Sequence, residues 1–118
     1  ITVVFTGPHA ATVGPTLQAA KAQGIPYRTA SYPFNDHGKS IIMDAMHGFV
    51  KLLCDPESGE ILGGVCVGPM GGELIHEIVT AMAKRMTVTE LASMPHYHPT
   101  LAEIWTYPAD ALTEEITR

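Results

Sequence analysis

The residues best suited to chemistry lie close together near the end of the sequence: His96, His98 and Glu103. A histidine side chain has an unperturbed pKa of about 6.5, so it can accept and return a proton near neutral pH. A carboxylate beside it can orient the ring and stabilise its protonated form. Glu103 is five residues after His98, at the start of an expected helix, and can reach back to that ring. The spacing therefore permits an acid/base pair.

Two other interpretations compete for the same residues. Thr100-x-x-Glu103 matches a capping box, in which Thr100 caps the last helix and Glu103 returns a bond to the Thr100 backbone. Spacing alone does not favour the acid/base pair over the capping box. A metal site made of both histidines and Glu103 is weaker, because His96 and His98 alternate along an extended segment and point to opposite faces. We expect no metal site.

The remaining motifs give no second site. His76-Glu77 lacks the second histidine of the HExxH zinc motif, because position 80 is threonine, and we expect a solvated helix face. The glycine-rich stretch 68–72 lacks the lysine of a phosphate-binding loop, so it is expected to be a simple helix entry. The other histidines are expected on loops and are given no role: His9, His37 and His47.

Length and charge narrow the class of protein. A chain of 118 residues with 46% hydrophobic content fits one compact domain over residues 1–118 with its own core. The net charge is −5 and the basic residues are scattered, which argues against a nucleic-acid partner. The apolar runs are far shorter than the roughly 20 residues of a membrane-spanning helix. We therefore expect neither a nucleic-acid nor a membrane partner.

The two cysteines, Cys54 and Cys66, are not spaced as a redox motif and are expected to pack in the core. In the hairpin expected below, Leu53 pairs with Leu62, which places Cys66 opposite Phe49. Cys54 and Cys66 would then lie about 17 Å apart along the strands, too far for a disulfide. Two unpaired cysteines suit the reducing cytoplasm.

Hydrophobic patterning and turn residues predict the elements that must position these residues. Strands are expected over 2–6 and 25–34, and a hairpin over 48–54 and 61–67 with a turn through Asp55–Gly59. Helices are expected over 15–23, 73–86 and 87–94, whereas 39–47 is either a loop or one helical turn. A last helix is expected to begin at Thr100, break near Pro108 and resume over 109–113.

Several motifs together resemble one known family. They are Gly48-Phe49-Val50-Lys51, Glu73-Leu74-Ile75 and His98-Pro99-Thr100 with Glu103. These motifs, spread over nearly the whole chain, resemble the C-terminal dimerisation domain of the flavin-dependent pyridine nucleotide-disulfide oxidoreductases. Within that family, His96-x-His98-Pro99-Thr100-Leu101-x-Glu103 is most similar to the dihydrolipoamide dehydrogenases.

The resemblance implies an α+β fold, with an antiparallel sheet of about four or five strands and packed helices, in a symmetric homodimer. It implies that His98 is the acid/base for the dithiol/disulfide couple of the opposite subunit and that Glu103 holds its ring. It further implies a cis His98–Pro99 bond, which would set the His98 carbonyl near the partner's flavin, so that His98 and Pro99 contact the cofactor. FAD and NAD(P) would be bound by the full-length enzyme and not by this fragment alone.

The sequence begins at Ile1, already inside a β-like run. We therefore expect a fragment of a longer flavoenzyme, with FAD and NAD domains upstream, that is inactive by itself. Two alternatives stay within the family, a glutathione-reductase-like and a mercuric-reductase-like enzyme. A stand-alone dimerisation or ligand-binding module without chemistry is an alternative from another class, and a metal-binding module is the third.

Overall fold

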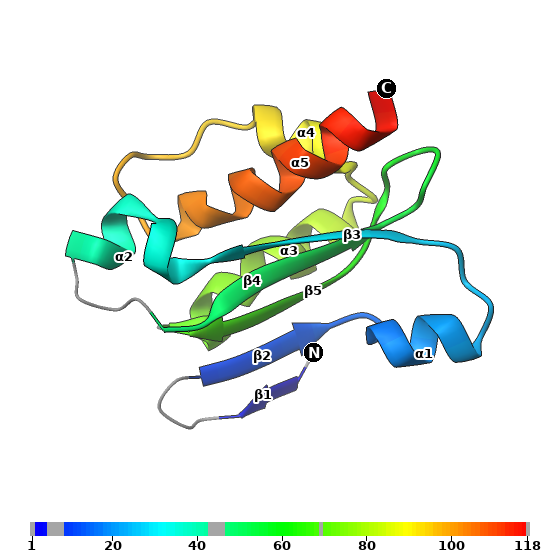
Figure 1. The fold of residues 1–118 in the computed structure, drawn as a ribbon, viewed down its shortest axis with the longest axis horizontal. Coiled ribbons are helices and arrows are strands. Elements are labelled where there is room, and N and C mark those ends of the chain that lie inside the picture. Colours follow the sequence, from blue (N-terminus) through cyan, green and yellow to red (C-terminus); the bar gives the residue numbers. More distant parts are fainter. Residues whose placement is uncertain (1, 5–8, 43–46, 69, 118) are drawn as a thin grey trace.

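The computed structural model describes residues 2–4, 9–42, 47–68 and 70–117. Its centre is a sheet of five strands in the order β1-β2-β5-β4-β3, in which every neighbouring pair is antiparallel (Figure 1). The strands are β1 (Thr2–Val4), β2 (His9–Val13), β3 (Arg28–Pro33), β4 (Phe49–Cys54) and β5 (Ile61–Gly68). With the helices that pack on it, this sheet confirms the expected α+β fold.

Strand β2 was not expected from the sequence. Two of its five residues are Ala10 and Ala11, and alanine has little preference for strands. The segment becomes a strand because β1 pairs along one side of it and β5 along the other. His9, expected on a loop, begins this strand, whereas His47 lies outside helices and strands and is exposed, as expected.

The β4–β5 hairpin is confirmed, but its expected register is wrong by one residue. Leu53 pairs with Gly63, not with Leu62, and Phe49 pairs with Val67, not with Cys66. The register changes between Leu53 and Cys54, where β5 contributes an extra residue, as at a β-bulge.

Short helices connect the strands, and longer ones cover one face of the sheet (Figure 1). Helix α3 (Gly71–Ala83) packs mainly on β5 and β2, and α5 (Thr106–Thr117) packs on β3 and β4. Helix α4 (Val88–Ser93) lies against α5. The others are α1 (Leu17–Ala22), α2 (Gly38–Ile42) and the 3-10 turns η1 (Phe34–Asp36) and η2 (Ala102–Trp105). The ambiguous 39–47 stretch is thus helical through Ile42, and residues 43–46 lie outside the described part of the chain.

Helix α5 continues through Pro108, which corrects the expected break. Pro108 is the third residue of this helix. The first four N–H groups of a helix have no partner inside it, so a proline there costs no intrahelical hydrogen bond.

The core lies between the sheet and these helices. Tyr32, Val50, Cys66 and Ala11 are neighbours across four strands, and the last three are fully buried. Helix α3 comes close to the sheet at Gly64, where a Cβ atom would lie 3.0 Å from a methyl group of Ile78.

The chain between α4 and η2 crosses the top of the helical layer and descends beside α2 (Figure 1). It thereby brings the C-terminal region next to the end of β3, although the two are far apart in sequence. In the residues that the structure describes, no helix is long and apolar enough to cross a membrane.

Candidate functional site

The structure brings His98 and Glu103 together. Nδ1 of His98 lies 2.7 Å from Oε1 of Glu103, a short distance typical of a charge-assisted hydrogen bond. The Glu103 side chain is only 14% exposed and the His98 side chain is 73% exposed. The peptide bond between His98 and Pro99 is cis, as the resemblance implies. The pair therefore consists of a covered carboxylate and a ring that faces solvent.

Thr100 fixes the turn that carries this pair. Its hydroxyl accepts a hydrogen bond from the Glu103 backbone N–H at 3.3 Å and donates one to the Tyr97 carbonyl at 2.7 Å. One half of the expected capping box is thus present, while the Glu103 carboxylate turns to His98. The two interpretations are compatible, because Thr100 supplies the backbone contact and Glu103 keeps an oxygen for the imidazole.

His96 faces the opposite way, as the alternation predicts. Its Nε2 lies 3.2 and 3.1 Å from the two carboxylate oxygens of Glu77 on α3, and its Nδ1 lies 3.0 Å from the Met94 carbonyl. The expectation that Glu77 lies on a solvated helix face is wrong, whereas His76 is exposed. Burial raises the pKa of Glu77, and the smaller effect of His96 opposes that rise. This contact ties the segment before His98 to α3.

His37 is the residue that sequence reasoning missed. It was expected on a loop without a role, yet it is fully buried, and its Nε2 lies 3.8 Å from Oε1 of Glu103. Burial lowers its pKa, Glu103 raises it by less, and His98 lowers it further. No local pattern could have found this contact, because it depends on tertiary packing between the end of β3 and η2.

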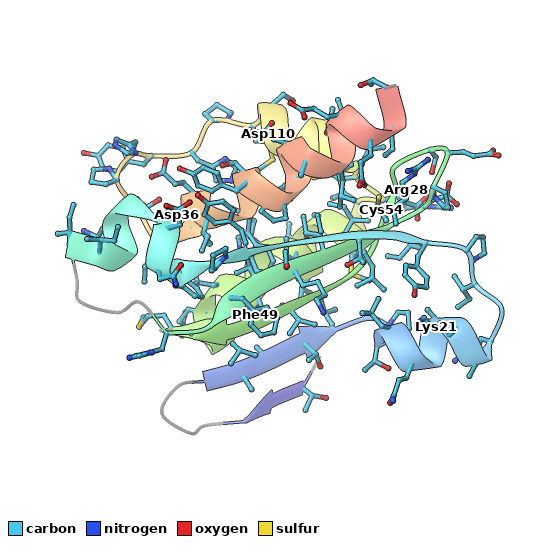
Figure 2. The ribbon with its side chains drawn as sticks, viewed as in Figure 1. Lys21, Arg28, Asp36, Phe49, Cys54 and Asp110 are labelled. Carbon is cyan, nitrogen blue, oxygen red and sulfur yellow. The ribbon has the colours of Figure 1, made fainter. Side chains whose placement is uncertain are left out.

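Aromatic rings line the same region. The Tyr107 ring of α5 meets His37 edge-on at 5.9 Å and stacks on Tyr32 of β3 at 4.3 Å. The Tyr32 hydroxyl donates to the Asp36 carboxylate at 2.8 Å, and Figure 2 shows Asp36 where α2 begins. Burial and Asp36 raise the pKa of Tyr32 to about 12. These rings close the inner side of the Glu103 site.

Neither cysteine of the chain can provide a reactive thiol at this site. Cys54 and Cys66 are both buried and free. Burial raises the pKa of Cys54 to about 11 and that of Cys66 to about 12, so both stay protonated at neutral pH. Figure 2 also shows Cys54 at the end of the sheet away from Asp36. Neither buried thiol is therefore available to react at the exposed surface that carries His98.

The pair also lies outside a groove on the surface of the described residues. An open groove of about 360 Å³ lies between α3 and α4, beside Glu77 and Met94, and neither His98 nor Glu103 lines it. Within the described residues, no three metal-ligating side chains gather as an ion would require. His98 is thus presented on an exposed surface, where a second molecule can approach it.

Comparison with known sequences identifies the family. Residues 1–109 match the dimerisation domain of the pyridine nucleotide-disulphide oxidoreductases. The chain belongs to this family. The resemblance stated from the sequence motifs is thereby confirmed.

Relatives in this oxidoreductase family are named dihydrolipoyl dehydrogenase. The enzyme from Vibrio parahaemolyticus is 37% identical over 115 residues, which cover 98% of this chain and 24% of the relative. A mitochondrial enzyme of Arabidopsis thaliana is 39% identical over 101 residues, covering 86% of this chain and 20% of the relative. The chain thus spans a fifth to a quarter of the length of these relatives.

Solved structures share the fold. The crystal structure of LpdA from Mycobacterium tuberculosis has a TM-score of 0.89 and 35% identity, and the match covers 94% of this chain and 24% of LpdA. The flavoprotein disulfide reductase RclA from Escherichia coli, at 20% identity, has a TM-score of 0.87 over 92% of this chain and 25% of RclA. At that identity, RclA supports the fold alone.

Proposed function

We propose that residues 1–118 are the dimerisation domain of a longer disulfide oxidoreductase of the dihydrolipoamide dehydrogenase type, which uses FAD and NAD(P). In a homodimer, each copy would supply His98 and Glu103 to the dithiol/disulfide site of its partner. Family membership and the relatives' names support this proposal.

One observation carries the proposal: the 2.7 Å contact between Nδ1 of His98 and Oε1 of Glu103 at an exposed surface. Because the carboxylate takes Nδ1, the other ring nitrogen of an exposed side chain is left to exchange a proton with an incoming group. Both cysteines of the chain are buried, so a thiol that reaches this ring lies outside residues 1–118. A pair with this arrangement suits a site that two subunits complete.

In the proposed thiol–disulfide exchange, the part of this chain is proton transfer by His98 and Glu103. A substrate thiol attacks a disulfide as its thiolate, and His98 accepts the proton that the thiol releases. That attack breaks the enzyme disulfide, joins one enzyme sulfur to the substrate and frees the other as a thiolate. The second substrate thiol then attacks the substrate sulfur of this mixed disulfide and releases the remaining enzyme sulfur, so the substrate dithiol becomes a disulfide and the enzyme disulfide becomes a dithiol. In the reverse direction His98 returns the proton. Glu103 stabilises the imidazolium in both directions.

His98 and Pro99 are also proposed to face the partner's flavin. Both residues are exposed, so the turn can approach a group that another subunit holds. A bound FAD would supply the acceptor for the electron pair of the dithiol, with NAD(P)⁺ as the final acceptor. The cytoplasm is proposed as the compartment, because the two free cysteines would stay reduced there.

The experiment compares three forms of the full-length protein with dihydrolipoamide and NAD⁺: wild type, His98→Ala, and His76→Ala as a control with an exposed histidine on α3. We expect His98→Ala to lose at least about 100-fold in kcat, as for removal of a general acid/base, and His76→Ala to keep the wild-type rate. FAD content and melting temperature should be equal in all three. A full-length protein without FAD would instead favour a non-catalytic module.

A further inference from the structure

Two histidines approach the same carboxylate oxygen. Oε1 of Glu103 lies 2.7 Å from Nδ1 of His98 and 3.8 Å from Nε2 of His37. His37 is fully buried, whereas His98 is 73% exposed. They come from separate elements, His37 from the turn before α2 and His98 from the chain that precedes η2. One carboxylate thus has an inner and an outer imidazole.

We propose that His37 is a positioning residue for the acid/base pair: its buried ring packs behind the Glu103 carboxylate and limits where that carboxylate can move, while Glu103 holds His98. The inference rests on the proposed function, because it gives His37 a part in the same site. His37 does not reach the surface, so it acts on the substrate only through Glu103.

The backbone and the packing around His37 fix its ring. Its N–H donates to the Phe34 carbonyl at 3.2 Å, and its own carbonyl accepts from the Ile41 N–H at 3.0 Å, which starts α2. The ring meets Tyr107 edge-on, and Tyr107 is stacked on Tyr32. A ring pinned in this way can serve as a fixed wall for a carboxylate that has two rotatable bonds beyond its Cβ.

Charge explains why an inner histidine helps the outer one. Burial lowers the pKa of His37 below its ordinary 6.5, which favours the neutral ring and leaves the charge of Glu103 to His98. In acid, a protonated His37 would compete with His98 for that single charge. The groups that face His37 include Glu103 from η2, His98 from the preceding turn and Tyr107 from α5.

The test uses the full-length flavoprotein with dihydrolipoamide and NAD⁺, and the variants His37→Gln and His37→Leu. Glutamine keeps a neutral polar side chain that cannot be protonated, and leucine fills similar space without polar atoms. We expect His37→Leu to lower kcat about 3- to 10-fold through misplacement of Glu103, with KM changed by less than about twofold. His37→Gln should recover most of the rate. Combined with Glu103→Ala, His37→Leu should cause less than about a twofold further loss.

The pH profile gives a readout that a purely structural role would not move. Rates are normalised to the folded, FAD-bound fraction at each pH. As the pH is lowered from about 7.5 through the acid range in which the enzyme keeps its FAD, the rate of His37→Gln relative to wild type should rise, because glutamine cannot compete as a cation. If His37→Leu does not fold, the pH dependence of the His37→Gln rate relative to wild type tests the inference by itself.

The inference is overturned if His37→Leu keeps the wild-type rate, if both variants lose equally, or if the normalised pH profiles coincide. The inference is also contradicted if His37→Leu lowers kcat as much in the Glu103→Ala protein as it does in the wild type. These results differ from failure of the proposed function, in which His98→Ala itself would keep its rate. A large loss in His98→Ala with no effect at His37 removes only the inference.

Discussion

Oε1 of Glu103 lies 2.7 Å from Nδ1 of His98, and the two side chains differ sharply in exposure, at 14% and 73%. The carboxylate is held by the domain while the ring faces outward. An acid/base that serves another molecule requires this asymmetry, since its orientation must be fixed from inside and its proton must be exchanged outside.

Glu103→Gln should lower kcat for dihydrolipoamide oxidation by about 10-fold or more, because an amide cannot stabilise the imidazolium of His98 as a carboxylate does. KM should stay within about twofold, because Glu103 is not proposed to bind substrate. Steady-state kinetics of the full-length protein measure both constants. Glu114→Gln, on an exposed position of α5, is the control and should behave as wild type. A wild-type rate in Glu103→Gln would remove Glu103 from the mechanism.

Glu77→Gln should change how stability depends on pH. Burial raises the pKa of Glu77 in the folded state above its ordinary 4.5, so the folded protein holds this proton to higher pH than the unfolded chain. Its contribution to stability is therefore fullest below pH 4.5 and is lost as pH rises through the folded pKa. Glutamine has no proton to lose.

Melting temperatures of the full-length protein at a series of pH values measure this effect. Relative to wild type, Glu77→Gln should gain stability as the pH rises above 4.5. Glu73→Gln, an exposed position on the same helix, serves as the control and should follow the wild-type curve. Parallel curves for wild type and Glu77→Gln would contradict the assigned direction.

Trp105→Phe should lower the free energy of unfolding by about 1 to 3 kcal/mol. The Trp105 indole is fully buried, and its N–H donates to the Leu74 carbonyl of α3 at 3.0 Å. Phenylalanine leaves that carbonyl without this donor and leaves space behind it. Denaturant unfolding measures the change, and Tyr97→Phe, at an 81% exposed ring, should leave stability unchanged. Equal stability of all three proteins would show that this bond does not hold η2 to α3.

Gly48→Ala should prevent folding or lower the melting temperature by many degrees. Gly48 has a φ of +102°, and a Cβ atom there would overlap the Val67 carbonyl oxygen of β5. The three nearest atoms are all backbone atoms of β5, which leaves little room to relax. Gly38→Ala is the matched control, because nothing lies within 4 Å of its added Cβ. A Gly48→Ala protein as stable as Gly38→Ala would mean that the β4 entry is placed differently.

The elements of the fold that could be predicted are those set by local sequence patterns. Apolar positions at helical spacing defined α3, and Asp55 to Gly59 defined the hairpin turn, because such signals need no distant partner. Strand β2 had no such signal and exists because two neighbouring strands pair with it. The register of β4 and β5 depended on a bulge, which the turn sequence does not encode.

The candidate site divided in the same way. His98 and Glu103 could be proposed together because five residues separate them and a helix start brings them within reach. The contacts of Glu77 with His96, and of His37 with Glu103, join elements that only the packed fold brings together. Sequence therefore indicated the outer imidazole and its carboxylate, and the structure added the inner histidine and the anchor on α3.

Mixed dimers test the central claim most directly, which is that His98 of one subunit serves the thiols of the other. Full-length His98→Ala subunits are mixed, by unfolding and refolding, with subunits in which the two cysteines of the proposed enzyme disulfide, which are neither Cys54 nor Cys66, are replaced by serine. Each homodimer is inactive, and a mixed dimer has one complete site. We predict recovery of about a quarter of the wild-type turnover, because half of the dimers are mixed and each has one of two sites. No recovery, with mixed dimers shown to form, would contradict the claim.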